Sequence, residues 1–286
     1  MSDGFVYLNG RMVPAAEAGV SVFDTGFLHG ASVFTTLLGH NGRGFRLDRH
    51  LARLKANAER IGLSHRATSE ELTRAVEEVL KANSLVEARI RITLSPGPVG
   101  AEPRPTTVVT ATQLQNEPQW YTRGLSVIIN QVRQYEHDPI AGVKTGCYLT
   151  RVLARQAAAA RGADEALWFT HSGLLAEASY CNVFLVRDGT VYTPPLSTPV
   201  LAGIVREAVI ELCGKLAIPC RDDGELQLQD VQQAQEMFLT SSTAGVRPVI
   251  RVDRQPVGDE KPGAVTRKIM SAYARLLEAE CPKGES

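Results

Sequence analysis

Two residues combine a reactive side chain with neighbours that solvate it poorly: Lys144 and Glu177. The lysine lies in Gly-Val-Lys-Thr-Gly-Cys-Tyr-Leu at 142–149, and the glutamate in Leu-Ala-Glu-Ala-Ser-Tyr-Cys-Asn-Val-Phe at 175–184. A lysine must lose its proton to attack an aldehyde, and apolar surroundings lower a lysine pKa in that direction. A carboxylate suits a pyridinium nitrogen, because it keeps such a ring protonated as an electron sink. The pair therefore predicts a Schiff-base lysine and a pyridine-binding carboxylate.

These are the groups that pyridoxal 5′-phosphate requires, although a solvated surface lysine and a glutamate in a structural salt bridge are the ordinary alternatives. A cofactor with a phosphate also needs backbone amides at the start of a helix. The turn at 201–206 follows a proline-rich stretch and leads into an apolar series at helical spacing. That series is Val205, Ala208, Val209, Leu212 and Leu216. Gly203 to Val205 are therefore expected to form a helix N-terminus that favours an anion.

Two further segments could complete a phosphate site. A hydroxyl-rich turn at 239–245, Leu-Thr-Ser-Ser-Thr-Ala-Gly, ends an apolar strand and offers hydroxyl and amide donors, although such turns often have no other role. Arg53 lies in an expected helix whose core face is Leu51, Leu54, Ala58 and Ile61. The arginine points away from that face, toward either solvent or a ligand.

Four blocks of the chain resemble the class IV, or fold type IV, pyridoxal-phosphate enzymes. This family contains the branched-chain and D-amino acid aminotransferases and the aminodeoxychorismate lyases. The blocks are 24–30 with 33–34, Arg53 in its helix, Lys144 followed by 148–149, and Glu177 with 182–184, 203–204 and the turn at 241–243. They occur in the order and at the spacing of the family, over nearly the whole chain.

The resemblance implies a role for each matching residue. Lys144 would form the internal aldimine, Glu177 would pair with the pyridine nitrogen, and Leu201 would pack against the ring. The phosphate would be held by Arg53, by the amides at Gly203, Ile204 and Val205, and by Ser242 and Thr243. The resemblance also implies a homodimer with a shared active site and the cofactor between two domains.

The chain departs from the family pattern at a few positions. Thr35 stands where most aminotransferases of this group carry glutamate. Val205 stands where a threonine is usual, and this change keeps a backbone amide contact but removes a hydroxyl contact. The pair Thr35-Thr36 is similar to some of the lyases, whereas Leu38 replaces an arginine that those lyases carry. Candidates for the pocket are His29, Phe34, Thr35 and Tyr148, with the loop at 96–105.

Composition limits the remaining possibilities. The chain has 286 residues, 44% of them hydrophobic, and equal numbers of basic and acidic residues. It can therefore fill one or two cores, and nothing suggests a nucleic-acid or membrane partner. There is no signal segment and no apolar run of membrane-spanning length, so a cytoplasmic location is expected. The five cysteines and six histidines show no metal-ligand spacing, so no metal site is expected.

The order of expected elements predicts an α+β protein of two domains. A hairpin about Asn9-Gly10, helices at 48–61 and 70–82, and strands at 88–94 and 106–111 form a small N-terminal α/β domain at 1–116. A polar linker at 117–123 precedes a larger cofactor-binding domain at 124–286, for which the family implies a pseudo-barrel. It contains a strand at 125–130, hairpins at 171–173 and 188–189, and helices at 148–160 and 264–278. The packed face of the helix at 148–160 is expected to be its apolar stripe, Leu149, Val152, Leu153, Ala157 and Ala160.

The favoured hypothesis is an aminotransferase that moves an amino group between an amino acid or amine and a 2-keto acid through Lys144. Two alternatives remain at this stage. One is an aminodeoxychorismate lyase that eliminates pyruvate and forms 4-aminobenzoate on the same scaffold. The other is a non-catalytic protein that kept the fold, since a fold alone does not fix a function.

Overall fold

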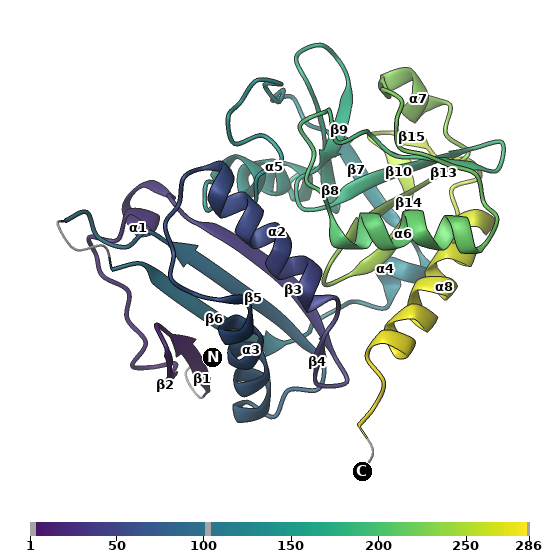
Figure 1. The fold of residues 1–286 in the computed structure, drawn as a ribbon. Helices are drawn as coiled ribbons and strands as arrows, with labels where there is room; N and C mark the ends of the chain where they lie inside the picture. Colours follow the sequence, from purple (N-terminus) through teal and green to yellow (C-terminus); the bar gives the residue numbers. More distant parts are fainter. Residues whose placement is uncertain (1–3, 101–103, 285–286) are drawn as a thin grey trace. The chain divides into compact units, whose positions relative to one another are not determined.

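The computed structural model describes residues 4–100 and 104–284, and the chain divides into two compact units (Figure 1). Unit 1 comprises Met1–Gln115, Val143–Cys147 and Leu277–Ser286, and unit 2 comprises Asn116–Gly142 and Tyr148–Leu276. The short segment that carries Lys144 thus belongs to unit 1, although its neighbours on both sides belong to unit 2. The domain boundaries at 116 and 124 stay a prediction.

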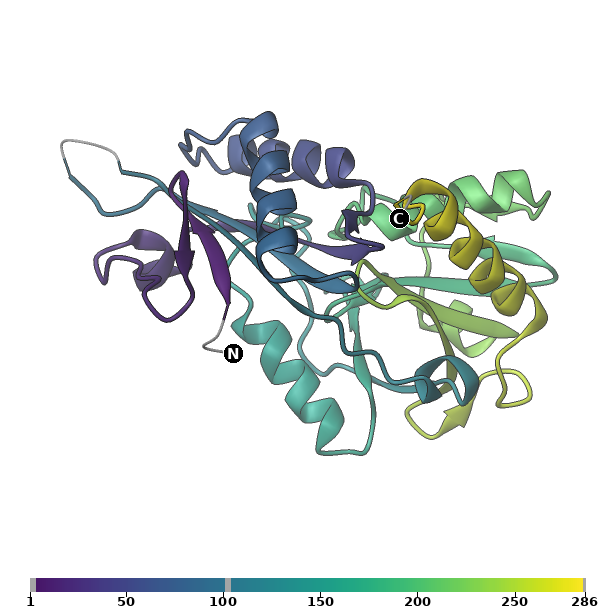
Figure 2. The ribbon, with the colours of Figure 1, turned by 90° about the horizontal axis from the view of Figure 1, so that it is seen from below.

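Unit 1 is a six-stranded antiparallel sheet with two helices on one face (Figures 1 and 2). The strand order is β2-β1-β6-β5-β3-β4. The strands are β1 (Phe5–Leu8), β2 (Arg11–Pro14), β3 (Val33–His40), β4 (Arg43–Gly44), β5 (Ala88–Ser95) and β6 (Thr106–Gln113). The helices are α2 (Leu47–Arg60) and α3 (Ser69–Ala82), with the short α1 (Thr25–His29) before β3.

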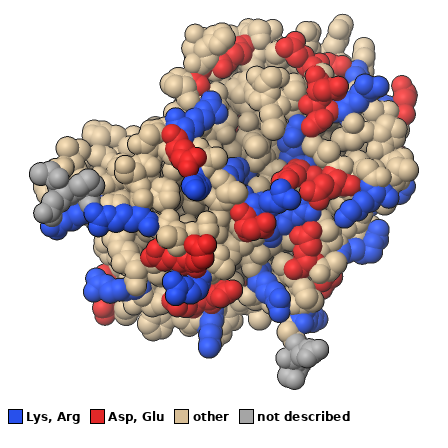
Figure 3. Space-filling model, in the orientation of Figure 1, with Lys and Arg blue, Asp and Glu red and all other residues tan. Residues whose placement is uncertain are grey.

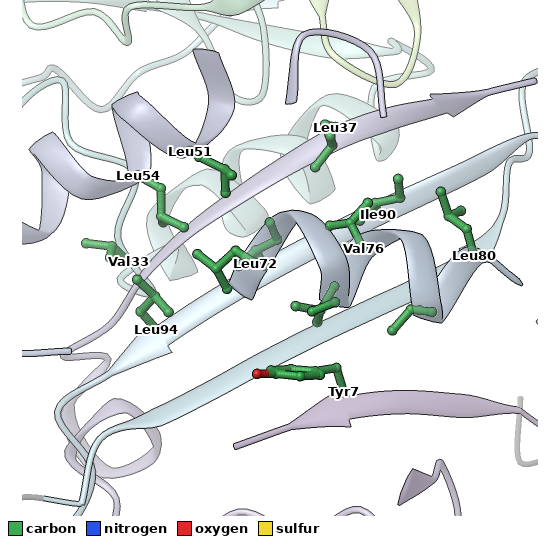
Figure 4. Packing of buried hydrophobic residues seen from close by; sticks show 14 of the residues in the cluster. Tyr7, Val33, Leu37, Leu51, Leu54, Leu72, Val76, Leu80, Ile90 and Leu94 are labelled. Carbon is green, nitrogen blue, oxygen red and sulfur yellow. The ribbon is translucent and has the colours of Figure 1, made fainter. Parts of the chain in front are cut away.

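Local sequence signals explain these elements. Asn9 and Gly10 both have positive φ, 49° and 89°, as the expected tight turn of the β1–β2 hairpin requires. Helix α3 begins where Thr68 accepts a hydrogen bond from the amide of Glu71. Alternate residues of β5 face the helices and form the core with α2, α3 and β3 (Figure 4). The buried set includes Val33, Leu37, Leu51, Leu54, Leu72, Val76, Leu80, Ile90 and Leu94.

Unit 2 is a nine-stranded mixed sheet with helices packed against it. The order is β12-β11-β10-β13-β14-β7-β8-β9, with β15 paired to β14. The strands are β7 (Leu125–Ile129), β8 (Glu165–Phe169), β9 (Leu175–Ala178), β10 (Asn182–Arg187), β11 (Thr190–Tyr192), β12 (Cys220–Arg221), β13 (Glu236–Ser241), β14 (Gly245–Val252) and β15 (Gln255–Pro256). The helices are α4 (Gln119–Thr122), α5 (Leu149–Ala159), α6 (Ile204–Lys215), α7 (Leu228–Gln232) and α8 (Ala264–Glu280), the last of which ends in unit 1.

The predicted packed face of helix α5 is wrong. Leu149 and Leu153 are 69% and 53% exposed, whereas the buried residues of the helix are Ala154 and Ala158. The two alanines pack with Ile128, Ala166 and Trp168. Small side chains let the helix approach the sheet closely, so the sheet-facing side of the helix is marked by alanine rather than by leucine.

Two findings concern possible partners. On the face drawn in Figure 3, acidic and basic side chains are interspersed. Within the described ranges, no helix is long and apolar enough to cross a membrane, and no cluster of three or more His, Cys, Asp or Glu side chains could hold a metal ion.

Candidate active site

The residues singled out in the sequence fall in both units. Unit 1 holds Lys144 and Arg53, together with the pocket candidates His29, Phe34 and Thr35. Unit 2 holds Glu177, Leu201, Gly203, Ile204, Val205, Ser242, Thr243 and the pocket candidate Tyr148.

Lys144 is fixed beside the start of β3. The amide of Phe34 donates to the carbonyl of Lys144 at 2.9 Å, the amide of Gly146 donates to the carbonyl of Ser32 at 2.8 Å, and Thr145 bridges to Val33. These backbone bonds place Lys144 Nζ 4.7 Å from the centre of the Phe34 ring. Arg91 Cζ lies 3.6 Å from the same centre. Two cationic groups thus contact one aromatic ring, an arrangement in which the ring attracts each while they repel each other.

Thr35 joins Arg53 to a buried histidine. Arg53 Nη2 lies 3.1 Å from Thr35 Oγ1, and that oxygen lies 2.7 Å from His50 Nδ1. A guanidinium only donates, so Thr35 Oγ1 accepts from Arg53 and its hydroxyl proton can be donated to His50 Nδ1. In that arrangement a neutral His50 carries its own proton on Nε2. In agreement, burial and then the charges of Arg53 and Lys144 hold the pKa of His50 well below its ordinary value.

The other two pocket candidates of unit 1 differ in exposure. Phe34 is buried and contacts Lys144, while His29 is exposed at the end of α1. Thr35 itself has no exposed surface, because its hydroxyl is enclosed between His50 and Arg53. The structure thus gives Thr35 contacts inside the unit that its sequence position did not indicate.

In unit 2, the carboxylate of Glu177 has a donor on each oxygen. Arg151 Nη2 lies 2.8 Å from Oε1, and the amide of Leu201 donates to Oε2 at 3.0 Å. The carbonyl of Leu201 accepts from Asn182 Nδ2 at 2.9 Å. The amide and the carbonyl of Leu201 are therefore hydrogen-bonded to side chains of β9 and β10. These bonds fix the path of the chain into helix α6.

Helix α6 begins without a side-chain cap. Its N-cap is Gly203, which has no side chain to accept from the amides of the first turn. A Cβ at position 203 would lie 2.0 Å from Asn182 Oδ1, so the close approach of strand β10 requires glycine. The uncapped amides and the helix dipole at Ile204 and Val205 are suited to an anion.

The hydroxyl-rich turn lies beside this helix start through strand pairing. Asn182 of β10 is in register with Thr240 of β13, and Ser242 and Thr243 follow in the turn to β14. Thr240 Oγ1 is buried and finds no hydrogen-bond partner among the described residues. The turn is held by Asn116, which donates to the carbonyl of Thr243 at 3.0 Å. An uncapped helix, an unused hydroxyl and a turn with two hydroxyl groups together fit a phosphate.

Arg151 is the site residue that sequence reasoning missed. It lies three and seven residues before the buried Ala154 and Ala158, so it projects from the packed side of α5 toward strand β9. That spacing could have indicated a buried arginine, but the misassigned stripe concealed it. Tyr148, at the start of the same helix, lies against Tyr180 with ring centres 5.4 Å apart.

Comparison with known proteins agrees with these features. The family model "Amino-transferase class IV" matches residues 32–252. A putative branched-chain-amino-acid aminotransferase from Methanocaldococcus jannaschii is 33% identical over 275 residues, covering 94% of each chain. A D-alanine aminotransferase from Bacillus licheniformis is 28% identical, covering 97% of this chain and 99% of the relative. The crystal structure of the branched-chain amino acid aminotransferase from Escherichia coli superposes with a TM-score of 0.92 at 27% identity, covering 97% of this chain and 96% of the other.

The family match covers most of the chain, the M. jannaschii relative exceeds 30% identity over nearly its full length, and the α+β two-domain architecture is that of fold type IV. The chain therefore belongs to the class IV aminotransferases, enzymes that transfer amino groups.

Proposed function

We propose that this aminotransferase works with pyridoxal 5′-phosphate bound covalently to Lys144, and that its substrates are amino acids and 2-keto acids. When bound, the cofactor delocalises the electrons left on the substrate α-carbon after its proton is removed. The residues of the chain then have to hold the cofactor, keep its nitrogen paired and move one proton.

The observation that carries the proposal is the arrangement around Leu201 in unit 2. Its amide is bonded to the carboxylate of Glu177, and two residues later Gly203 begins an uncapped helix. One short segment, 201–205, thus connects a carboxylate that suits a pyridine nitrogen to amides that suit a phosphate. We assign the nitrogen to Glu177 and the phosphate to the amides of Ile204 and Val205, with Leu201 against the ring.

Further residues complete the assignment. Ser242 and Thr243 supply hydroxyl donors to the phosphate, and Arg53, oriented by Thr35, supplies a fixed cation. Lys144 Nζ, released when the amino donor binds, would move a proton from the substrate α-carbon to C4′ of the cofactor in the first half-reaction, and from C4′ to the α-carbon of the keto acid in the second. Phe34, His29 and Tyr148 are proposed to line the substrate pocket.

The test is a visible spectrum of the purified protein with added cofactor, followed by a panel of amino donors. The donors are L- and D-alanine, L-glutamate, L-leucine and a simple (R)-amine. We expect one donor class to convert the absorbance to that of the aminated cofactor. Because relatives are named for branched-chain amino acids and for D-alanine, the panel separates these substrates. Lys144→Ala should abolish both the absorbance and turnover, and turnover that survives this substitution would rule out the assignment.

Aminodeoxychorismate lyase activity is the second candidate, favoured by Thr35-Thr36 in place of the usual glutamate. It predicts pyruvate release from aminodeoxychorismate without any amino acceptor. A spectrum that no donor changes, together with such release, would favour the lyase.

We also propose a homodimer. In unit 1, five apolar side chains at and before α1 are exposed, which is unusual for a surface that only contacts water. They are Val20, Val22, Phe23, Phe27 and Leu28, here called the α1 patch. A second copy of the chain would cover this patch. The cytoplasmic location stays a prediction.

A further inference from the structure

Arg151 makes more contacts than a salt bridge needs. Its side chain is only 14% exposed, and Nη2 lies 2.8 Å from Glu177 Oε1 and 3.3 Å from Gln134 Oε1. Nη1 donates to the carbonyl of Ala178 at 3.3 Å, and Cζ lies 4.3 Å from the centre of the Trp168 ring. Burying a guanidinium is costly unless its protons are satisfied, so this network holds the group in one orientation.

The same network fixes one segment by two routes. Through Glu177, Arg151 is connected to the amide of Leu201. Through Gln134, which donates from Nε2 to the carbonyl of Pro199 at 2.8 Å, it is connected to the residue two positions earlier. The carboxylate and the segment at 199–201 therefore share one central cation.

The consequence for Glu177 is a fixed carboxylate plane. Rotation of the carboxylate would break the bond to Arg151 or the bond to Leu201, because the two donors lie on different oxygens. Each carboxylate oxygen can accept more than one hydrogen bond, so a third donor can be added without displacing either. The planar fork of a guanidinium can donate to several acceptors at once, so Arg151 holds Glu177 in a defined geometry.

We propose that Arg151 is a positioning residue that presents Glu177 to the pyridine nitrogen of the cofactor; this inference rests on the proposed function. Arg151 acts through Glu177 and does not itself touch the cofactor. A lysine in its place would keep the charge but could not reach Glu177, Gln134 and Ala178 together, since an ammonium lacks the planar fork.

The experiment is a double-mutant cycle on the affinity for pyridoxamine 5′-phosphate, which binds without a covalent link and so needs no turnover. Four proteins are compared by equilibrium dialysis: wild type, Arg151→Met, Glu177→Gln and the double variant. We expect Arg151→Met to weaken binding about tenfold in the wild-type background, which corresponds to about 1.4 kcal/mol. In the Glu177→Gln background the same substitution should weaken binding less than twofold, because Arg151 then has no carboxylate to present.

Matched variants guard against a general folding effect. Arg155→Met removes an exposed arginine one turn further along α5 and should change the affinity less than twofold. Arg151→Lys should fall between wild type and Arg151→Met, and it serves as the test variant if Arg151→Met has a melting temperature too low for dialysis. In turnover, kcat should fall more than KM rises.

The outcomes separate the two proposals. If Arg151→Met weakens binding equally in both backgrounds, or not at all, the positioning role is wrong while the proposed function stands. If wild-type protein binds neither pyridoxamine 5′-phosphate nor pyridoxal 5′-phosphate, both proposals are overturned.

Discussion

His50 is a buried base that must be neutral for unit 1 to fold as described. Its Nδ1 lies 2.7 Å from Thr35 Oγ1, and burial together with the charges of Arg53 and Lys144 disfavours a second proton on the ring. The pKa of His50 is therefore lower in the folded protein than in the unfolded chain. Below the ordinary value of 6.5 the unfolded chain binds a proton that the folded protein excludes, so stability falls as pH falls.

The measurable consequence is the slope of stability against pH. Below pH 6.5, down to the lowered pKa, His50 should contribute up to about 1.4 kcal/mol of lost stability per pH unit. Urea unfolding at about pH 7.5 and about pH 5.5, on either side of that value, should show that His50→Gln loses less stability over this interval than wild type. His171→Gln, which changes an exposed histidine, should behave like wild type. Identical slopes for wild type and His50→Gln would contradict a neutral His50 in the folded protein.

Thr35 gives a second prediction at this scale. Thr35→Val keeps the shape but removes the hydroxyl that lies against the buried Nδ1 of His50 and one contact of Arg53, which should lower stability by about 1–3 kcal/mol. Affinity for pyridoxamine 5′-phosphate should also fall severalfold, because Arg53 loses the group that orients it. Thr35→Ser keeps the hydroxyl and should restore both properties. If Thr35→Val instead changes only the preference among amino donors, Thr35 belongs to the substrate pocket, as its sequence position first indicated.

At the scale of elements, Gly203 fits strand β10 to the start of helix α6. Gly203→Ala would place Cβ against Asn182 Oδ1, and Asn182 cannot withdraw without losing its bond to Leu201. We expect a loss of about 1–3 kcal/mol in the free energy of unfolding and weaker phosphate binding.

The matched control lies in the same helix. At Gly214 an added Cβ would meet no described atom within 4 Å, so Gly214→Ala should stabilise the protein by about 0.5–1 kcal/mol. Chemical denaturation of both variants decides the matter. A Gly203→Ala protein as stable as wild type would show that the close approach of Asn182 is not a constraint.

The elements also show how far the sequence could predict this protein. The Asn9-Gly10 hairpin, the helix at 70–82 and the helix after Gly203 were predicted correctly, because each depends on residues that are neighbours in the chain. The packed face of α5 was wrong, because apolar spacing cannot say which side of a helix meets the sheet. The bond between Arg151 and Glu177 joins residues 26 positions apart on a helix and a strand, and no local pattern encodes it.

For the whole molecule, the distribution of exposed apolar surface bears on assembly. Phe23 and Phe27 are 70% and 72% exposed, and three more apolar residues of the α1 patch accompany them. Scattered exposed hydrophobic side chains are common on monomers, but five in one short segment are the pattern expected of an interface. The cost of leaving such a group in water is the physical reason to expect a second copy on it.

Sedimentation equilibrium tests this expectation. The wild-type protein should have twice the 31.0 kDa mass of the chain. Phe27→Glu puts a charge into the buried patch of the dimer and should shift the equilibrium toward monomer by at least about tenfold, because an unpaired charge is expensive to desolvate. Leu196→Glu changes an equally apolar, 55% exposed residue outside the α1 patch and should leave the dimer intact. A wild-type monomer, or a Phe27→Glu protein that dimerises as tightly as wild type, would show that the α1 patch is not the interface of a homodimer.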